Sequence, residues 1–470
     1  MLHVLSCGHV ASGCASFRGS VTDESDRCRH STRSDLPRGS GLILFRSDSP
    51  IGVFASVSVF LSLRGSDPKH RMRSFACFQG ELETESSMRI AQVAPLYERV
   101  PPLYYGGTER VASYLTEELV DQGHEVTLFA SGDSLTKAKL VSPCAQSLRL
   151  NPNCVDFLAY HVLQLEQIFQ QAHLFDIVHF HIDYFHYPFL RRQDIAHVTT
   201  LHGRLDMPDL VPLYREFCDM PAVSISDAQR TPLAWIDWRG TVYHGLPRNL
   251  YRFNKQQGKY LAFLGRISPE KRLDRAIEIA KRAKMPLKIA AKIDAVDRCY
   301  MEKEIRSLLD HPLVEFLGEI DDGSKSDFLG NAYALLFPID WPEPFGLVMT
   351  EAMACGTPTV AFRRGSVPEV LDDQISGYVV DDVEQAVEAL KAIRHFDRAR
   401  CRRVFEERFS VRRMAQDYVK IYQRVIDGRV RAHSTPARQS GAIVPRRDEI
   451  AAKGNGAPLA AAGCAANLSP

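Results

Sequence analysis

The sequence predicts an α/β protein made of two doubly wound domains, each with a parallel sheet covered by helices on both faces. Short apolar segments of strand length alternate with amphipathic helical segments, and this alternation occurs in two successive halves of the chain. The length agrees, because 470 residues exceed what a single ordinary hydrophobic core organises. Such sheets bind ligands beyond the carboxyl ends of their strands, so two facing sheets imply a cleft between the domains.

The first half, residues 88–247, opens with a strand, a glycine pair and a helix. Apolar residues recur at helical spacing from Val111 to Leu119, and Gly123 ends this helix. Strands of this half are expected at 90–94, 126–130, 177–180, 198–201 and 223–225.

The second half, residues 248–411, repeats the scheme after a linker expected near 244–254. Each strand is followed by a helical pattern, which is typical of a parallel sheet. Strands are expected to begin near Tyr260, Leu287, Val314, Leu335, Thr359 and Tyr378.

The two ends of the chain do not fit this scheme. Residues 1–87 are rich in Ser and Arg, contain four cysteines and show no sustained period, so we expect a spurious or unfolded extension. A targeting segment or a regulatory tail is the alternative. Residues 429–470 are rich in Ala, Gly and Pro, and we expect them to be disordered.

Composition excludes several classes of protein. The 58 basic and 57 acidic side chains nearly cancel, which argues against a nucleic-acid partner. No apolar run reaches the roughly 18 residues of a transmembrane helix. The eleven cysteines form no CxxC pair, so we interpret them as thiols in a reducing cytoplasm.

Two glutamates flank the start of a helix in the segment DWPEPFGLVMTEAMACG. Glu343 lies in the Pro-rich turn, and the helix then begins with the unpaired amides of Gly346, Leu347 and Val348, which suit a phosphate. Glu351 leans back toward the same place and can accept hydrogen bonds from a diol such as ribose. The alternative is that both glutamates are solvated carboxylates near a helix start, where acids are favoured.

A second polar loop follows the strand that begins at Tyr260. It carries Arg266 and, five residues later, Lys271, before a helix with apolar residues at helical spacing. Basic residues at the carboxyl end of a parallel strand are positioned to bind an anion. The alternative is a solvated basic loop.

These two loops, GRISPEK and EPFGLVMTEAMACGTP, resemble those of the nucleotide-sugar glycosyltransferases of family 4, the retaining class with the GT-B fold. Four further segments match in order: MRIAQVAP; YYGGTERVASYLTEELVDQGHEVTLFASG; DIVHFHIDYFH with TTLHG; and AVSISDAQR with VYHGLP. The resemblance covers residues 88–426. It implies two facing Rossmann-like domains with an interdomain cleft and a last helix, residues 412–428, that crosses back to the first domain.

The resemblance also implies a metal-independent, retaining transfer of a hexose-like sugar from a nucleoside-diphosphate sugar to a hydroxyl acceptor, without a cofactor. Arg266 and Lys271 would bind the diphosphate together with the helix amides, Glu343 would hold the sugar and Glu351 the ribose. The acceptor could be a saccharide, a lipid-linked group or a small molecule, and peripheral membrane association stays open. Donor base, sugar and linkage cannot be inferred from the sequence.

Gly106, Gly107 and His202 are candidates on the side of the first domain. The glycine pair could let the backbone approach the donor, or could simply form a tight turn that needs a positive φ. His202 aligns with a histidine that contacts the transferred sugar in the family, whereas a lone histidine is more often structural. His244 replaces the asparagine of the family's VxNG motif, which leaves the interdomain contact at this position open.

The segment HFHIDYFH could alternatively form a zinc site. Strand alternation would place His179, His181 and Asp183 on one face, with His186 nearby, and imidazole with carboxylate is an acceptable ligand set. We favour the family's use of this strand end to line the acceptor side and therefore predict no metal.

The sequence also allows two rival functions. A sugar-nucleotide epimerase with the GT-B fold would also bind a nucleotide sugar in the cleft, but it lacks the glutamate pair with an upstream GRxxxEK loop. A non-catalytic binder of nucleotide sugars is the other rival, and the retention of every reactive motif residue argues against it.

Overall fold

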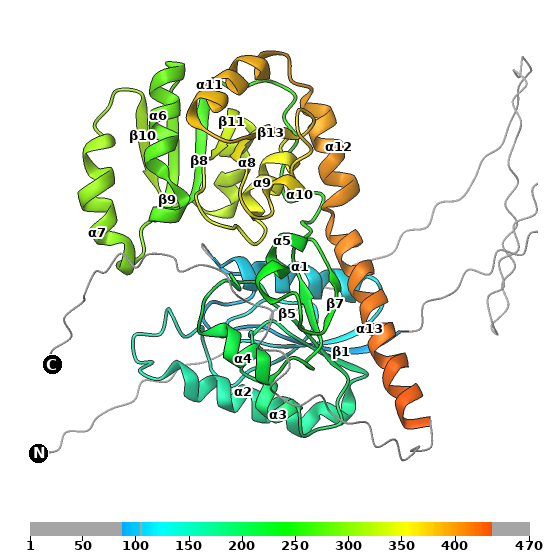
Figure 1. Ribbon diagram of the computed structural model, residues 1–470. Helices are drawn as coiled ribbons and strands as arrows, with labels where there is room; N and C mark the ends of the chain where they lie inside the picture. Colours follow the sequence, from blue (N-terminus) through cyan, green and yellow to red (C-terminus); the bar gives the residue numbers. More distant parts are fainter. Residues whose placement is uncertain (1–86, 104–105, 435–470) are drawn as a thin grey trace, which may run out of the picture. The chain divides into compact units, whose positions relative to one another are not determined.

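The computed structural model describes residues 87–103 and 106–434, which all belong to one compact unit, Leu82–Pro470. It contains two parallel sheets of seven and six strands, so the predicted fold class is confirmed (Figure 1). The expectations for residues 1–86 and 435–470 lie outside the described residues.

The seven-stranded sheet forms the first lobe. Its strand order is β3-β2-β1-β4-β5-β6-β7, and the order reverses beside β1, where a doubly wound sheet binds ligands. Each predicted strand lies within one residue of an observed one, but β3 and β7 were missed because they are only partly buried and show no apolar alternation. The strands are β1 (Arg89–Val93), β2 (Glu125–Phe129), β3 (Lys139–Val141), β4 (Ile177–Phe180), β5 (His197–Thr200), β6 (Ala222–Ser224) and β7 (Trp238–Thr241).

The six-stranded sheet forms the second lobe, and its order is β10-β9-β8-β11-β12-β13. The order reverses between β8 and β11. Arg266 is the last residue of β8, and the polar loop that follows carries Lys271. Five of the six predicted strand starts lie within one residue of the observed ones, and β11 begins at Ala332, three residues before the predicted Leu335. The strands are β8 (Tyr260–Arg266), β9 (Leu287–Lys292), β10 (Val314–Gly318), β11 (Ala332–Phe337), β12 (Thr359–Phe362) and β13 (Gly377–Val380).

Helices bury both faces of each sheet. On β1, Ile90 packs in the cluster that includes α1 and α13, whereas Ala91 packs in the cluster that includes α2. On β8, Leu261 and Ala262 likewise belong to separate clusters on opposite faces. The helices are α1 (Gly107–Asp121), α2 (Phe157–Gln171), α3 (Tyr187–Leu190), α4 (Leu210–Glu216), α5 (Asp227–Arg230), α6 (Leu273–Ala283), α7 (Arg298–Tyr300), α8 (Asp322–Gly330), α9 (Leu347–Ala354), α10 (Val367–Val370), α11 (Val383–Ala392), α12 (Arg398–Arg408) and α13 (Val411–Ser434).

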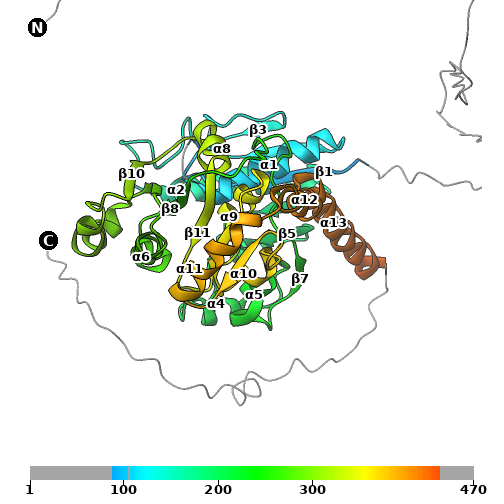
Figure 2. The same ribbon diagram turned by 90° about the horizontal axis from the view of Figure 1, so that it is seen from above.

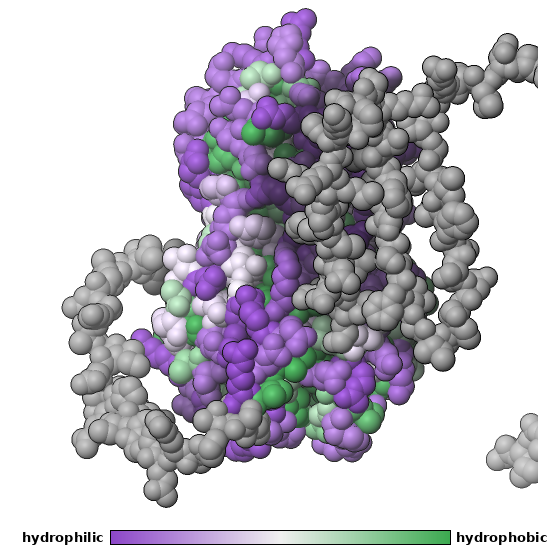
Figure 3. Space-filling view, turned by 90° about the vertical axis from the view of Figure 1, so that its right-hand side faces the viewer, coloured by the Kyte–Doolittle hydropathy of each residue, from purple (hydrophilic) through white to green (hydrophobic). Residues whose placement is uncertain are grey.

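The last helix, α13, crosses from the second lobe to the first. It continues the path of α12 in both ribbon views and packs on α1 and β5 (Figure 1, Figure 2). Its apolar side is buried, including Tyr418 and Tyr422, and it ends at Ser434, six residues beyond the expected boundary at 428. On the side that carries α12 and α13, the visible surface is mostly hydrophilic with small hydrophobic patches (Figure 3).

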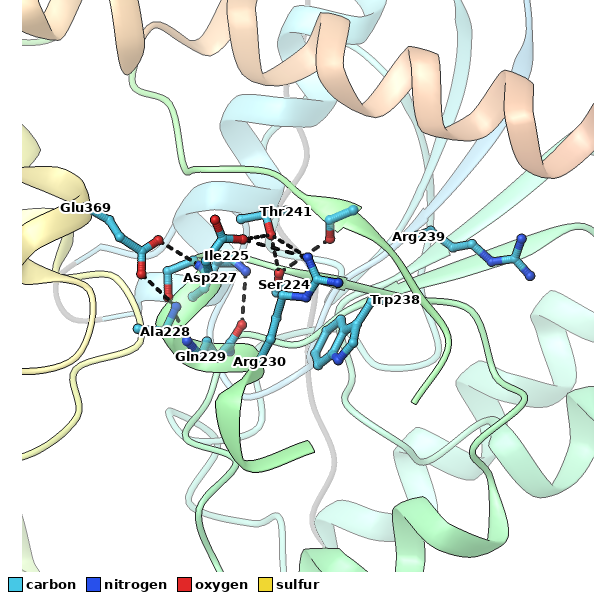
Figure 4. A network of polar contacts seen from close by, with 12 residues as sticks. Ser224, Ile225, Asp227, Ala228, Gln229, Arg230, Trp238, Arg239, Thr241 and Glu369 are labelled. Carbon is cyan, nitrogen blue, oxygen red and sulfur yellow. Dashed lines mark hydrogen bonds and ion pairs between the residues drawn. The ribbon is translucent and has the colours of Figure 1, made fainter. Parts of the chain in front are cut away.

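A polar network joins the lobes beside the cleft. Glu369 of α10 accepts hydrogen bonds from the backbone N–H groups of Asp227 (2.7 Å) and Ala228 (2.6 Å), at the start of α5 (Figure 4). Glu369 of the second lobe therefore pairs with free N–H groups at the start of α5 in the first lobe. A second contact between the lobes is the ion pair of Arg110 in α1 with Asp322 in α8.

Candidate active site

A cavity of about 570 Å³ lies between the two lobes, at the carboxyl ends of their strands. Residues from both lobes line it, and all ten residues predicted from the sequence to be catalytic or donor-binding are among them. These are Gly106, Gly107, His202, Arg266, Lys271, Glu343, Gly346, Leu347, Val348 and Glu351.

The start of α9 is fixed by Gly346. Its φ of 80° is left-handed, so any other residue would strain the backbone here, and a Cβ, 2.7 Å from the Cε atom of Met349, would also displace the end of that side chain. The helix begins at Leu347, as the Pro-rich turn predicts, and it directs its first-turn amides and positive dipole end at the cavity.

Lys271 and Glu343 meet in the cavity as an ion pair from two loops. Glu343 is 8% exposed and also accepts a hydrogen bond of 2.8 Å from the indole N–H of Trp341. The ammonium of Lys271 lies 4.9 Å from the centroid of the Trp341 ring. Trp341 therefore stabilises both members of the pair, Glu343 through a hydrogen bond and Lys271 through a cation–π contact.

Arg266 lines the same cavity but contacts a different set of carboxylates. Its guanidinium lies 2.5 Å from Glu270, 3.5 Å from Asp294 and 3.4 Å from Asp297. These contacts hold the guanidinium at the end of β8, on the same wall of the cavity as Lys271.

Glu351 is 5% exposed and lies in the first turns of α9. Its carboxylate accepts a hydrogen bond of 2.9 Å from the Tyr251 hydroxyl, and the Lys325 ammonium lies 3.6 Å away. Burial raises the pKa of Tyr251 well above its ordinary value, so this hydroxyl stays a donor. Tyr251 and Lys325 are distant in sequence from the glutamate motif, and no local pattern pointed to them.

Neither glycine of the pair adopts a left-handed backbone, so the alternative of a tight turn that needs a positive φ is wrong. Gly106 has φ 161°, which is extended backbone, and a Cβ there would lie 2.8 Å from the Cβ of Pro102. A Cβ at Gly107 would lie 3.7 Å from Leu347 of the second lobe. The missing side chain of Gly106 thus lets the start of α1 approach its own loop, whereas a Cβ at Gly107 would make only an ordinary van der Waals contact with α9.

His202 follows β5 and faces the cavity from the first lobe. Its ring stacks on His244 with centroids 5.3 Å apart, and its Nε2 lies 2.9 Å from Nδ1 of His181. Burial lowers the pKa of His202 to about 3, so the ring is neutral at physiological pH. His244, which departs from the family motif, is therefore a cavity residue too.

Two acids also line the first lobe's side of the cavity. Asp183 has a left-handed φ of 51° and is open to the cavity, yet surrounding protein raises the pKa of its carboxyl to about 6. Glu109 in the first turn of α1 is 6% exposed, and burial raises its pKa to about 7. The site prediction did not include Glu109, although it lies in the segment GGTER, just after the predicted glycine pair.

The alternative zinc site does not fit the geometry of β4. Both ring nitrogens of His179 and of His181 are engaged with other side chains, and His186 stacks on Phe180 with centroids 3.8 Å apart. Across residues 87–103 and 106–434, no group of three or more His, Cys, Asp or Glu side chains could hold a metal ion. Within the same ranges, no helix is long and apolar enough to cross a membrane.

The two-lobed cleft is that of the GT-B fold, and comparison with family models identifies the class of protein as a glycosyltransferase. The family model described as "Glycosyl transferases group 1" matches residues 251–404, and the one described as "Glycosyltransferase Family 4" matches residues 105–267. Together the matches span more than half of the chain. The chain belongs to the family 4 type of GT-B glycosyltransferases.

Individual proteins resemble it at low identity. N-acetyl-alpha-D-glucosaminyl L-malate synthase of Bacillus anthracis is 28% identical over 371 residues, covering 68% of this chain and 94% of that relative. AviGT4, a glycosyltransferase involved in avilamycin A biosynthesis, has a similar structure with a TM-score of 0.56 and 23% identity, over 73% of this chain and 98% of its own. Anabaena HepE in complex with UDP and glucose has a TM-score of 0.54 and 17% identity, over 72% of this chain and 100% of its own.

Proposed function

We propose that the protein is a retaining, metal-independent glycosyltransferase that moves a hexose-like sugar from a nucleoside-diphosphate sugar to a hydroxyl acceptor. The observation that carries this proposal is the convergence of Lys271, Glu343, Glu351 and the start of α9 on one cavity. HepE binds UDP and glucose and has the same fold, which supports a nucleotide-sugar donor. The proposal needs no cofactor besides the donor.

The residues of the second lobe match the charges that develop in this reaction. Negative charge grows on the leaving diphosphate, where Lys271, Arg266 and the α9 amides act as pre-placed donors. Positive character grows at the anomeric carbon, and Glu343 stabilises it while holding the sugar hydroxyls. Glu351 accepts hydrogen bonds from the ribose hydroxyls.

The bond changes need no protein nucleophile. The bond from the anomeric carbon to the diphosphate oxygen breaks, and the acceptor oxygen forms its bond on the same face of the sugar. The acceptor's proton passes to the leaving diphosphate oxygen. Because the new bond forms on the face that the diphosphate leaves, the product keeps the donor's anomeric configuration. His202 contacts the transferred sugar from the first lobe.

A nucleotide-release assay tests the proposal. A thermal-shift screen of nucleotide sugars first identifies the donor, because a ligand of the folded state raises apparent stability. We then expect nucleoside diphosphate to appear faster with acceptor than in water, unchanged by EDTA, and NMR of the product to show retention. An inverted product or loss of activity in EDTA contradicts the mechanism, release of a 2-epimeric sugar indicates an epimerase, and binding without release indicates a binder.

A cytoplasmic location is part of the same proposal. The six cysteines of the described residues are all free thiols, including the buried Cys355 and Cys401. Free thiols are typical of a reducing compartment. The acceptor stays open among a saccharide, a lipid-linked group and a small molecule, with peripheral membrane association in the second case.

A further inference from the structure

A chain of hydrogen bonds between side chains connects α13 with His202. Nε2 of His202 lies 2.9 Å from Nδ1 of His181, and Nε2 of His181 lies 2.9 Å from the side-chain oxygen of Gln92 in β1. The amide NH₂ of Gln92 donates to the hydroxyl of Tyr422 in α13 at 3.0 Å. Apart from His202, these side chains are at most 2% exposed.

The chain continues beyond Tyr422 to a second tyrosine of α13. The Tyr422 hydroxyl lies 2.7 Å from Nδ1 of His179, and Nε2 of His179 lies 2.7 Å from the hydroxyl of Thr200. The hydroxyl of Thr200 lies 2.9 Å from that of Tyr418. Thus α13 contacts the sheet of the first lobe through two buried hydroxyl groups, and only Tyr422 bonds to Gln92.

The histidines of this chain of hydrogen bonds, His179, His181 and His202, are neutral, so each has one N–H group and one nitrogen without a proton. Burial lowers the pKa of His179 and His181 well below the ordinary value, and that of His202 to about 3. A neutral imidazole between two partners must donate to one and accept from the other. The protons in such a chain therefore all point the same way.

Gln92 sets this direction through the orientation of its side-chain amide in the structure, because the amide oxygen can only accept a hydrogen bond and the NH₂ group can only donate one. Its oxygen accepts from His181, so the proton of His181 is on Nε2 and Nδ1 is bare. That bare nitrogen accepts the Nε2–H of His202. The Tyr422 hydroxyl accepts from Gln92 and donates onward to His179, which agrees with the same direction.

The open end of the chain is Nδ1 of His202. This nitrogen has no hydrogen-bond partner among the residues that the structure describes, whereas the ring itself lines the cavity beside His244. A buried acceptor without a partner is unfavourable, and a ligand hydroxyl is the group that would satisfy it.

We propose that Gln92 and Tyr422 are positioning residues that hold His202 as the Nε2–H tautomer and so present its Nδ1 as an acceptor for a hydroxyl of the bound sugar. The inference rests on the proposed function for the identity of the ligand. It gives α13 a role in the site besides joining the lobes: a hydroxyl on this helix determines which hydrogen bond His202 makes. A purely structural role would require only that these buried polar groups satisfy one another.

Tyr422→Phe and Tyr418→Phe form a matched pair of variants. Both tyrosines are fully buried in α13, one helical turn apart, and both lose one hydroxyl. Tyr418→Phe removes only the far end of the chain and leaves Gln92 held. Tyr422→Phe frees the Gln92 amide to rotate and present its NH₂ to His181. His181 would then donate its hydrogen bond to His202 instead of accepting one from it.

The tautomer of His202 is measured by ¹⁵N NMR of histidine-labelled protein, with the signal assigned from His202→Gln. We expect a single Nε2–H tautomer in the wild type and in Tyr418→Phe, and a mixture in Tyr422→Phe. Steady-state kinetics should show kcat lowered roughly tenfold in Tyr422→Phe, the size of one lost neutral hydrogen bond, with an unchanged KM for the donor. Gln92→Met tests the same link from β1 should Tyr422→Phe not fold.

Two results would overturn the inference. One is an Nδ1–H tautomer in the wild type, which means that the chain runs in the opposite direction. The other is an equal effect of both tyrosine variants on kcat with no change of tautomer, which indicates a structural role alone. The tautomer is measured without turnover, so absence of any sugar transfer by the wild type would refute the proposed function and leave the tautomer result standing.

Discussion

Lys271 is the cation whose removal tests the proposed chemistry most directly. Its ammonium forms an ion pair with Glu343, and the two side chains are only 18% and 11% exposed. In Lys271→Ala the pre-placed positive charge is lost, and Glu343 keeps the Trp341 indole as its remaining donor. The uncompensated carboxylate then repels the departing diphosphate, so both effects act against the transition state.

The size of the effect follows from the cost of losing one pre-organised donor. Such a loss typically lowers kcat by about 10² to 10³, or roughly 2.7–4 kcal/mol of transition-state stabilisation. The KM for the donor should change much less, because the α9 amides and Glu351 are intact and bind the ground state. We therefore expect the defect of Lys271→Ala in kcat rather than in KM.

Initial rates of nucleoside diphosphate release over a range of donor concentrations provide the measurement. Lys255→Ala is the matched control, since Lys255 is exposed and does not line the cavity. Circular dichroism confirms that both variants fold. A decrease in kcat of less than about tenfold, or ~1.4 kcal/mol, would refute the assignment of Lys271 to the leaving diphosphate.

Three further predictions concern carboxylates. Glu351→Ala should raise the donor KM by about 10- to 100-fold with little change in kcat, because it removes charged hydrogen bonds to the ribose. Glu369→Gln should lower the free energy of unfolding by ~1–2 kcal/mol and speed amide hydrogen exchange at Asp227 and Ala228, because the cap of α5 weakens. Glu109→Gln should remove a pH dependence of stability. Burial raises the pKa of Glu109 from 4.5 to about 7, so the folded state holds this proton more tightly than the unfolded state. Wild-type stability should therefore fall by up to about 3 kcal/mol as pH rises from 4.5 through 7, while the variant should not show this loss.

Each of these three has its own control and contrary outcome. For Glu351→Ala, an unchanged KM together with a lower kcat would remove the residue from ribose binding. Glu388→Gln, in an exposed pair with Lys391, serves as the control for Glu369, and equal exchange rates in both variants would mean that the cap does not hold α5. Glu166→Gln on the exposed side of α2 is the control for Glu109, and parallel pH profiles of wild type and Glu109→Gln would contradict the predicted titration.

The strands and the two polar loops could be predicted from the sequence because their signals are local. Apolar segments located the buried strands of the first lobe and five of the six strand starts of the second lobe to within one residue, whereas β11 begins three residues before the predicted position. The pattern failed at β3 and β7, where partial burial removes it. Proline and glycine positions predicted where α9 begins, since they restrict the backbone over a few residues. The convergence of Lys271 with Glu343 followed from the parallel-sheet rule and from the family resemblance together.

Residues that complete the site escaped prediction because their partners are remote in the sequence. Tyr251 donates to Glu351 across 100 positions, and Gln92 meets Tyr422 across 330. The glycine pair shows the same limit, since Gly106 is required by the approach of Pro102 rather than by a turn.

The sequence alone determined the α/β class, the order of strands and helices, and the loops that carry charge to the carboxyl ends of the strands. These features depend on residues within a few positions of one another. The tertiary structure alone decided which buried side chains form hydrogen bonds with one another and where Glu369 meets α5. It also decided that the tyrosines of α13 lie against His179 of β4 and Thr200 of β5. Such pairings depend on how the lobes and the crossing helix pack, and contacts between distant positions leave no period or spacing in the chain.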